Sequence, residues 1–205
     1  MEHIHLGVVD WARVNKRPVK MVFKQVENCN YVIEIAKARP FGFSLVGVGG
    51  KDIVDGNRKL TLALVWQLMR CHLLAFLAGV RTARGSGGGM SDAEMVAWAN
   101  SKVRQGGCGL EIRDFHDKSL GSGLFLIELL AAVEPRCIDR SLVTPGESDE
   151  DRKLNAKYVI SSARKIGCSL FLLWEDIVEV RPKMILSFIA TVMSHAMVDA
   201  QPTSS

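Results

Sequence analysis

The stretch DIVDGNRKL at residues 52–60 has a close copy later in the chain, DIVEVRPKM at residues 176–184. Met69 and Met193, which follow the two stretches at the same spacing, also match. A second pair, NCNYVI at residues 28–33 and NAKYVI at residues 155–160, precedes them in the same order and shares Asn, Tyr, Val and Ile. Ordered self-similarity of this kind is typical of a repeated structural unit. The sequence therefore predicts two copies of one helical unit.

The two copies are predicted to be unequal. Residues 92–154 precede the NAKYVI stretch and carry two helical patterns, whereas residues 1–27 precede the NCNYVI stretch and show no such patterns. We therefore expect one complete unit and one unit that lacks its first helices.

A glycine-rich segment separates the two copies. RTARGSGGGMSDAE at residues 81–94 contains four glycines between two apolar regions, and such a segment holds regular structure only at an entropic cost. Directly after it, Ser91 and Glu94 have the spacing of a capping box, which predicts a helix from Asp92 to about Val103 or Arg104. The predicted organisation is a first domain at 1–82, a linker at 83–91, a second domain at 92–199 and a tail at 200–205.

The rest of the second copy also reads as helical. The apolar stretch 119–135 predicts a mostly buried helix that ends near Val133, because a proline follows. Ser148 and the acidic residues after it predict the start of a helix that ends at Gly167. Pro182 suits the first turn of a last helix, where its missing N–H group costs nothing. These patterns predict an all-α protein.

The glycines of GVGGKD, residues 47–52, raise the question of a phosphate-binding loop. A Walker loop would need glycine where Leu45 stands and serine or threonine where Asp52 follows Lys51, and Asp52 also replaces the third glycine of a dinucleotide fingerprint. The stretch is therefore predicted to be a turn in which the glycines adopt conformations closed to other residues. Asp55 or Asn57 is expected to cap the helix that follows. That helix, from about residue 57 to residue 77, is apolar around most of its circumference and is predicted to be central and buried.

The sequence VENCNYVIEIAKARPFGFSLVGVGGKDIVDGNRKLTLALVWQLMR, residues 26–70, resembles calponin-homology domains, and closely those of the second actin-binding domain of the fimbrin (plastin) family. The DIVDGN element before an apolar helix that contains Trp66, and the WAN stretch at residues 98–100, carry the resemblance. It implies a calponin-homology fold with four main helices. Residues 1–82 would match the later part of a third domain in that family, and residues 92–199 a whole fourth domain.

The resemblance also implies a partner, filamentous actin. In calponin-homology pairs that bind actin, the last helix of the first domain and the first helix of the next contribute to the filament contact. The polar positions at which this chain would make that contact are Asn57, Arg58, Lys59, Thr61, Gln67 and Arg70 on the first, and Asp92, Glu94, Asn100 and Lys102 on the second.

The missing front of the first domain has a physical consequence. Without its first helices, the central helix around Trp66 would leave roughly 400 Å² of apolar surface uncovered, which is unusual in a soluble monomer. We therefore expect a homodimer through the truncated first domain, an exchange of elements, or loose folding.

Other functional classes find little support in the sequence. The net charge of +4 is modest and spread along the chain, which does not favour nucleic-acid binding. Five cysteines without a Cys-x-x-Cys pair disfavour a disulfide framework and a zinc ribbon, and they suit a reducing compartment. Five histidines, at positions 3, 5, 72, 116 and 195, show no metal-binding spacing. GSGLF at residues 121–125 is not placed as a nucleophile elbow. No cofactor, metal site or catalytic residue is predicted.

The amino terminus lacks a secretion signal, and no window holds 18 uninterrupted apolar residues, so neither secretion nor a membrane span is predicted. The sequence thus favours a non-catalytic, cytoplasmic protein of the actin cytoskeleton, part of a filament-crosslinking or bundling protein. The alternative is a calponin-homology scaffold that binds a protein other than actin.

Overall fold

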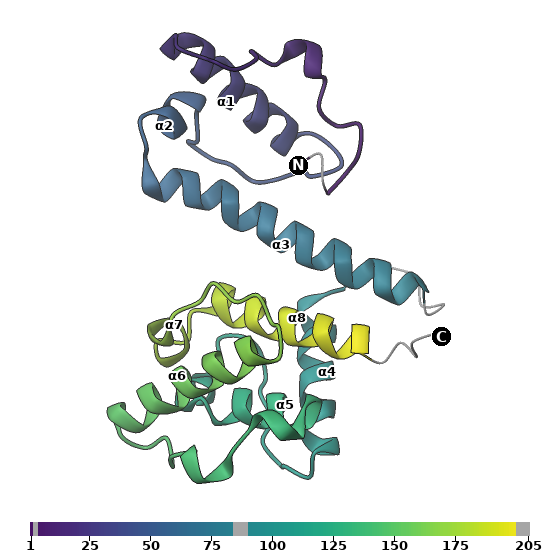
Figure 1. The fold of residues 1–205 in the computed structure, drawn as a ribbon, viewed down its shortest axis with the longest axis vertical. Coiled ribbons are helices and arrows are strands. Elements are labelled where there is room, and N and C mark those ends of the chain that lie inside the picture. Colours follow the sequence, from purple (N-terminus) through teal and green to yellow (C-terminus); the bar gives the residue numbers. More distant parts are fainter. Residues whose placement is uncertain (2–3, 84–89, 200–205) are drawn as a thin grey trace. The chain divides into compact units, whose positions relative to one another are not determined.

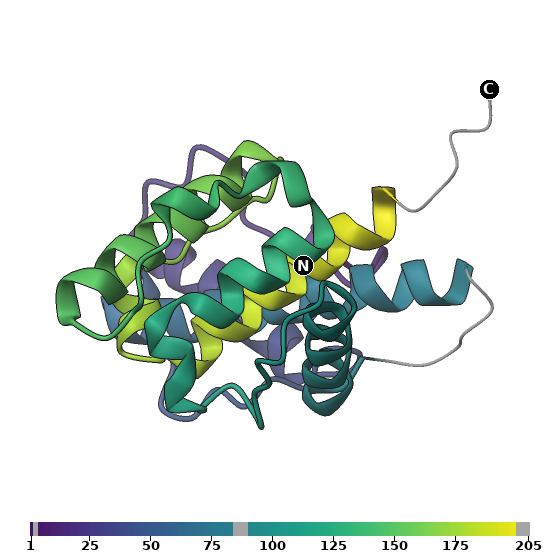
Figure 2. The same cartoon turned by 90° about the horizontal axis from the view of Figure 1, so that it is seen from below.

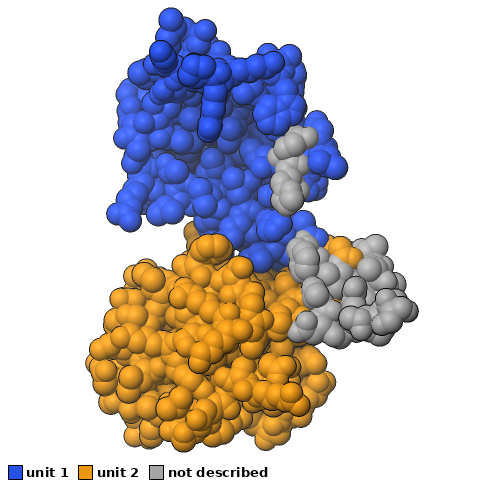
Figure 3. Space-filling view, viewed as in Figure 1, with its two compact units in different colours: residues 1–75 blue, residues 76–205 orange. Residues whose placement is uncertain are grey.

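The computed structural model describes residues 1, 4–83 and 90–199, and every regular element in these ranges is helical (Figure 1). The chain forms two compact units, residues 1–75 and residues 76–205 (Figure 3). The elements are η1 (Trp11–Arg13), α1 (Val22–Lys37), α2 (Gly50–Val54), α3 (Arg58–Ala83), α4 (Asp92–Gln105), η2 (Lys118–Ser122), α5 (Leu124–Val133), η3 (Pro135–Cys137), η4 (Arg140–Leu142), α6 (Asp149–Lys165), α7 (Trp174–Val178) and α8 (Pro182–Asp199). The predicted all-α fold is confirmed.

The residues repeated in the sequence make the same hydrogen bonds in both copies. In the first copy, the backbone N–H of Asp10 donates to the hydroxyl of Tyr31 at 2.7 Å, and Asp10 caps η1. In the second copy, the N–H of Asp139 donates to the hydroxyl of Tyr158 at 2.6 Å, and Asp139 caps η4. The matched tyrosines of the NxxYVI stretches therefore join a short helix to a long one in each copy. Tyr31 joins η1 to α1, and Tyr158 joins η4 to α6.

The matched asparagines form a second set of equivalent hydrogen bonds. Asn28 on α1 accepts from the N–H of Asn15 at 2.9 Å and donates to its carbonyl at 3.0 Å. Asn155 on α6 accepts from the N–H of Thr144 at 2.9 Å and donates to its carbonyl at 3.1 Å. Asn155 is completely buried and also donates to the carbonyl of Ser122.

The DIV stretches form short helices, and the matching aspartate of each stretch accepts a hydrogen bond at the start of its helix. Asp52 accepts from the N–H of Gly49 at 2.8 Å at the start of α2, and Asp176 accepts from the N–H of Leu173 at 2.7 Å at the start of α7. The predicted turn at GVGGKD was therefore incomplete, because a short helix begins at Gly50. Asn57, not Asp55, caps α3, since its side chain accepts from the N–H of Leu60.

The core of unit 2 surrounds α8. Side chains along α8, including Leu186, Phe188 and Ile189, are at most 4% exposed. This helix packs against α4, α5 and α7, and Figure 2 shows it running across the unit. The capping box at Ser91, the cap at Ser148 and the start of α8 at Pro182 are confirmed.

One predicted helix of unit 2 is divided in the structure. The stretch 119–133 forms η2 and then α5, with Gly123 between them in the left-handed conformation at φ +76°. A side chain at Gly123 would meet Asn155, so the break brings α5 directly against α6. The apolar pattern did not reveal this break because helical periodicity continues across it.

The central helix of unit 1, α3, is only partly buried, whereas its apolar circumference predicted a buried helix. Leu64 joins the small core formed with Ile33 and Ala36 of α1, but Leu62 is 57% exposed and Val65 is 49% exposed. Their counterparts on α8, Leu186 and Ile189, are 4% and 0% exposed, because α4 and α5 pack on that helix. Among the described residues of unit 1, no helix takes the place of α4 or α5.

By length and composition alone, the part of α3 from Arg58 to Gly79 could cross a membrane. The core helix of a globular fold passes the same test, and α8 at the matching place in the repeat is such a core helix. The repeat therefore accounts for the apolar character of α3. α3 extends to Ala83, whereas the predicted end was residue 77. Within the predicted linker, residues 84–89 lie outside the described residues, as does the predicted tail at 200–205.

Replacing Val180 by glycine is expected to raise the free energy of unfolding of unit 2 by about 1 kcal/mol, because a β-branched residue in the left-handed region is strained. Val180 has φ +49°, whereas Gly56 has φ +75° at the matching place in unit 1. Denaturant unfolding would measure the change. The reciprocal variant Gly56→Val should lose stability by a similar amount, and a stabilised Gly56→Val protein would contradict this explanation.

Candidate functional site

The predicted positions on α3 divide into exposed cations and side chains with structural roles. Arg58 and Lys59 are exposed in the first turn of α3. Asn57 caps the helix, and the buried hydroxyl of Thr61 has no hydrogen-bond partner among the described residues. Arg58 and Lys59 are therefore the side chains in this group that are best placed to meet a partner.

Gln67 has a structural role that its sequence position did not reveal. Its side-chain oxygen accepts from the N–H of Ser44 at 3.1 Å, and its nitrogen donates to the carbonyl of Ser44 at 2.9 Å. This pair of bonds holds the loop before α2 on the surface of α3. Arg70, one turn further along, is half-buried.

The predicted positions on α4 divide in the same way. Glu94 completes the capping box, because its carboxylate accepts from the N–H of Ser91 at 2.8 Å. Asn100 holds a loop, since it accepts from the N–H of Ile112 at 3.0 Å and donates to its carbonyl at 2.8 Å. Asp92 is exposed and Lys102 is half-buried. The predicted residues thus lie on two units, with those of α3 on unit 1 and those of α4 on unit 2.

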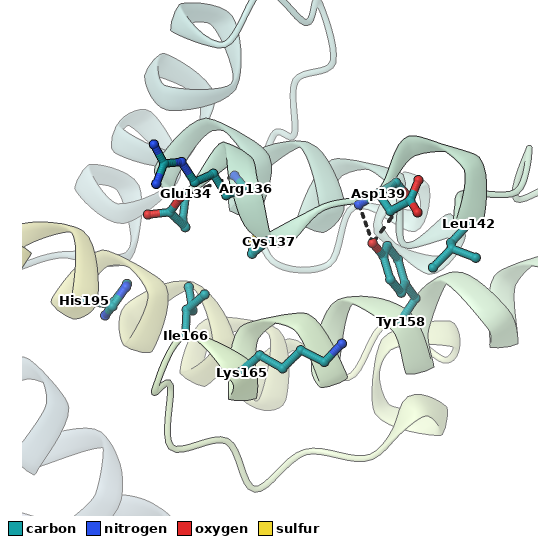
Figure 4. A pocket seen from close by; sticks show the side chains of 9 residues that line it. All are labelled: Glu134, Arg136, Cys137, Asp139, Leu142, Tyr158, Lys165, Ile166 and His195. Atoms are coloured by element: carbon teal, nitrogen blue, oxygen red, sulfur yellow. Dashed lines mark hydrogen bonds between the residues drawn. The ribbon is translucent and has the colours of Figure 1, made fainter.

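Unit 2 also contains a cleft that sequence reasoning missed. It has a volume of about 980 Å³. Figure 4 shows the segment from Glu134 to Leu142 along one side, Tyr158 and Lys165 of α6 along the other, and His195 of α8 at one end. The repeated tyrosine was the signal in the sequence, but its role depends on contacts between residues far apart in the chain.

The matching place in unit 1 is filled by an arginine. The guanidinium of Arg13 lies 4.1 Å from the centre of the Tyr31 ring and binds both carboxylate oxygens of Glu34, at 2.8 and 2.7 Å. The hydrogen bond from Arg13 lowers the pKa of Glu34. In unit 2, Leu142 stands in the place of Arg13, so this position offers the Tyr158 ring no guanidinium.

The cleft lacks an activated nucleophile. Burial raises the pKa of the Cys137 thiol, and the charge of Glu134 raises it further, so the thiol stays protonated at neutral pH. Glu134 accepts from the N–H of Arg136, and Asp139 accepts from the N–H and hydroxyl of Ser141, so both carboxylates serve as helix caps. Within the described ranges, no group of three histidine, cysteine or acidic residues is placed to hold a metal ion; His3 lies outside these ranges.

Two related helical units, each with a tyrosine that fastens a short helix and each with a long apolar helix, define a protein of repeated helical modules. The chain belongs to the calponin homology (CH) domain family, whose domain matches residues 1–73 and 90–198. The resemblance stated from the sequence is thereby confirmed.

The relatives that it matches include fimbrins and plastins. The chain is 52% identical over 193 residues to Fimbrin-3 of Arabidopsis thaliana, a match that covers 94% of this chain and 27% of the relative. It is 43% identical over 193 residues to Plastin-3 of Homo sapiens, covering 92% of this chain and 30% of the relative. Among solved structures, the actin-crosslinking core of Schizosaccharomyces pombe fimbrin is 44% identical with a TM-score of 0.75, covering 94% of this chain and 40% of that one. The chain thus spans less than a third of the curated relatives described here.

Proposed function

We propose that this chain binds filamentous actin and forms part of a fimbrin-like protein that crosslinks or bundles filaments. The observation that carries the proposal is the match along 94% of the chain to the actin-crosslinking core of a fimbrin, at 44% identity. The role is one of binding without catalysis, in the cytoplasm along the actin cytoskeleton. The filament contact consists of the predicted polar positions on α3 and α4. Asn57, Gln67, Glu94 and Asn100 are occupied by capping and loop-holding bonds, so Arg58 and Lys59, which are exposed, are the cations best placed to meet the filament.

Charge supports an encounter of this kind. Arg58 and Lys59 are exposed next to each other, and the chain carries a net charge of +4. Cations around a docking surface raise the rate of association with an acidic partner, and salt weakens that effect. Binding to filaments should therefore weaken as the ionic strength rises.

The double variant Arg58→Ala, Lys59→Ala is expected to weaken filament binding about fivefold, because two exposed charges at an interface are each worth on the order of 0.5 kcal/mol. Co-sedimentation with filamentous actin across a salt series measures the affinity, and a sample without actin accounts for self-pelleting. The matched control is Lys20→Ala, Lys24→Ala, which removes the same charge from exposed positions of unit 1.

These measurements also distinguish filament binding from the alternative function. A folded wild-type protein that fails to pellet with filaments at low salt would reject the proposal and favour a CH scaffold that binds another protein. Equal affinity of the Arg58/Lys59 variant and its control would leave filament binding in place but reject the contact on α3.

We also propose that the protein self-associates through α3. The supporting observation is the exposure of Leu62 and Val65 on a helix whose counterpart in unit 2 is covered. Exposed apolar surface of this kind favours association. Analytical ultracentrifugation should show a reversible dimer that the variant Leu62→Glu, Val65→Glu converts to monomer, whereas Leu142→Glu, at an exposed leucine of unit 2, should leave it intact. A monomer at all concentrations, with α3 fully protected in hydrogen exchange, would contradict the proposal.

A further inference from the structure

The start of α1 lacks the residues that begin its counterpart in unit 2. Asn28 of α1 matches Asn155 of α6, and the N-caps of the two helices, Met21 and Ser148, each lie seven residues earlier. The hydroxyl of Ser148 caps α6, whereas Met21 makes no side-chain hydrogen bond to α1. The same helix of the repeat therefore begins with a polar cap in unit 2 and with a methionine in unit 1.

The charges at the two helix starts are also opposite. The first turn of α6 carries acidic residues at 149–151, and the matching residues of α1 are Val22, Phe23 and Lys24. A capping serine and acidic side chains stabilise the start of a helix, because they bind its free N–H groups and complement its dipole. Helix stability therefore does not explain the residues at the start of α1, and a segment that breaks a local rule in this way is a candidate for function.

The apolar side chains at this helix start are open to solvent. Met21 is 57% exposed, Val22 is 61% exposed and Phe23 is 58% exposed. Consecutive residues of a helix point in different directions. The three side chains therefore spread outward from the end of α1 and do not form a single stripe along it.

Four exposed cations flank these apolar side chains in the sequence. Two hydrogen bonds hold the preceding loop against the first turns of α1, since Gln25 donates to the carbonyl of Val19 at 2.8 Å and Asn15 donates to the carbonyl of Lys24 at 3.4 Å. The loop and the helix start thus form one surface, residues 16–24, which we call the α1 patch. Its cations are Lys16, Arg17, Lys20 and Lys24.

The positive charge of the α1 patch has no partner among the described residues. Residues 14–26 contain the four cations and no acidic residue, and no described carboxylate pairs with any of the four. The acidic residues of α1 are engaged elsewhere, because Glu27 accepts from the side chain of Asn15 at 3.1 Å and Glu34 pairs with Arg13. The two aspartates of the α2 segment are bound as well, one at the start of α2 and one to a lysine. The charge is therefore available to an anionic partner.

The spread of the apolar side chains distinguishes between two kinds of anionic partner. A groove on a protein covers the side chains along one face of a helix. The interface of a lipid bilayer is fluid and takes in side chains that point in several directions. Apolar side chains that enter this interface act together with cations that contact anionic headgroups. An anionic membrane therefore fits the α1 patch better than an acidic protein does.

We infer that the α1 patch binds the surface of an anionic membrane. Met21, Val22 and Phe23 enter the boundary between headgroups and acyl chains, and the four cations contact the anionic headgroups. This is contact with one face of the membrane and not a span. The inference does not rest on filament binding, because the α1 patch shares no residue with the proposed contact on α3 and α4.

The test uses the whole chain and vesicles of phosphatidylcholine, with or without phosphatidylserine. Flotation in a density gradient measures binding, because protein that has only associated with itself does not float. The protein should bind the phosphatidylserine vesicles at least about tenfold more tightly than the neutral ones. Binding should weaken as the ionic strength rises, because salt screens the cations.

Two variants separate the charged and the apolar contributions. Lys20→Ala, Lys24→Ala should weaken binding to phosphatidylserine vesicles about 25-fold, because each cation near an anionic surface contributes about fivefold. Met21→Ser, Phe23→Ser should weaken it about tenfold. Serine at position 21 supplies the kind of cap that α6 has and should stabilise α1, so hydrogen exchange of α1 would show that lost binding is not lost folding.

Each variant has a matched control outside the α1 patch. Arg58→Ala, Lys59→Ala removes the same charge from exposed positions of unit 1. Phe171→Ser removes a phenylalanine that is 78% exposed on unit 2. Both controls should bind phosphatidylserine vesicles within about twofold of wild type.

Four results would overturn the inference. They are equal binding to the two kinds of vesicle, unchanged binding by either patch variant, and a loss in the controls as large as that in the patch variants. The fourth is a protein that does not float with phosphatidylserine vesicles and whose Lys20/Lys24 variant loses filament binding, which would assign the α1 patch to the acidic filament. Co-sedimentation of the same variants with filaments tests the proposed function separately, so either proposal can fail without the other.

Discussion

Replacing Asn155 by alanine is expected to lower the free energy of unfolding of unit 2 by about 3 kcal/mol, since buried groups that lose their hydrogen-bond partners cost on the order of 1–3 kcal/mol each. Asn155 is completely buried, and its amide accepts from Thr144 and donates to the carbonyls of Thr144 and Ser122. Removing it leaves those three backbone groups without their partner. Hydrogen exchange of α6 and α8 amides measures the loss within unit 2.

The repeat supplies the control for this experiment. Asn28→Ala removes the matching asparagine of unit 1, which is only half-buried, so water can replace part of what is lost and the cost should be about 1 kcal/mol. Asn155→Asp, which keeps the shape but loses both N–H donors, should be as harmful as Asn155→Ala. If Asn155→Ala lowers the free energy of unfolding no more than Asn28→Ala does, burial does not determine how much these hydrogen bonds stabilise each unit.

Replacing Gly50 by alanine is expected to destabilise unit 1 by about 3 kcal/mol, because added atoms in a close contact force the backbone apart. A Cβ atom at Gly50 would lie 2.6 Å from the carbonyl oxygen of Val26 and 2.7 Å from the backbone nitrogen of Asn30, in addition to 2.5 Å from the Asn30 side chain. Two of these three atoms belong to the backbone of α1, so α1 and α2 would have to separate. Loss of hydrogen-exchange protection in α1 reports the effect.

Two further variants give this prediction its control. Gly79→Ala is the same substitution in α3 at a site with no atom within 4 Å of the new Cβ, and it should stabilise the helix by about 0.5–1 kcal/mol. Asn30→Ala combined with Gly50→Ala removes the side-chain clash but keeps the two backbone clashes. Recovery of wild-type stability in that double variant would place the clash in the Asn30 side chain and contradict the argument.

Local chemistry accounts for the parts of the fold that the sequence predicted well. The capping box at Ser91, the cap at Ser148 and the first-turn proline at Pro182 act within one turn of helix, so their positions alone were sufficient. The repeat was also visible in the sequence, because the residues that fasten it, such as Tyr31 and Tyr158, are themselves repeated.

The features that the sequence did not predict depend on distant contacts. The missing first helices predicted that some apolar surface of α3 would be uncovered. Which side chains are exposed, such as Leu62, follows from which helices pack on α3, and apolar periodicity does not contain that information. The roles of Gln67 and Asn100 in holding loops were hidden for the same reason, since each bonds to a residue 23 or 12 positions away. The candidate contact was therefore predicted as a set of polar positions, and the structure divides that set by what each side chain already binds.

The close approach at Gly50 has a consequence for how the two copies can exchange genetic material. Gly50 N–H donates to Asn30 where α2 touches α1, whereas at the matching places Trp174 lies beside Lys157. A recombination event that moved the tryptophan into the first copy without its neighbours would force α1 and α2 apart, because even a Cβ atom at Gly50 meets the backbone of α1. Residues from the second copy can therefore replace this part of the first copy only if the neighbouring residues of α1 change with them.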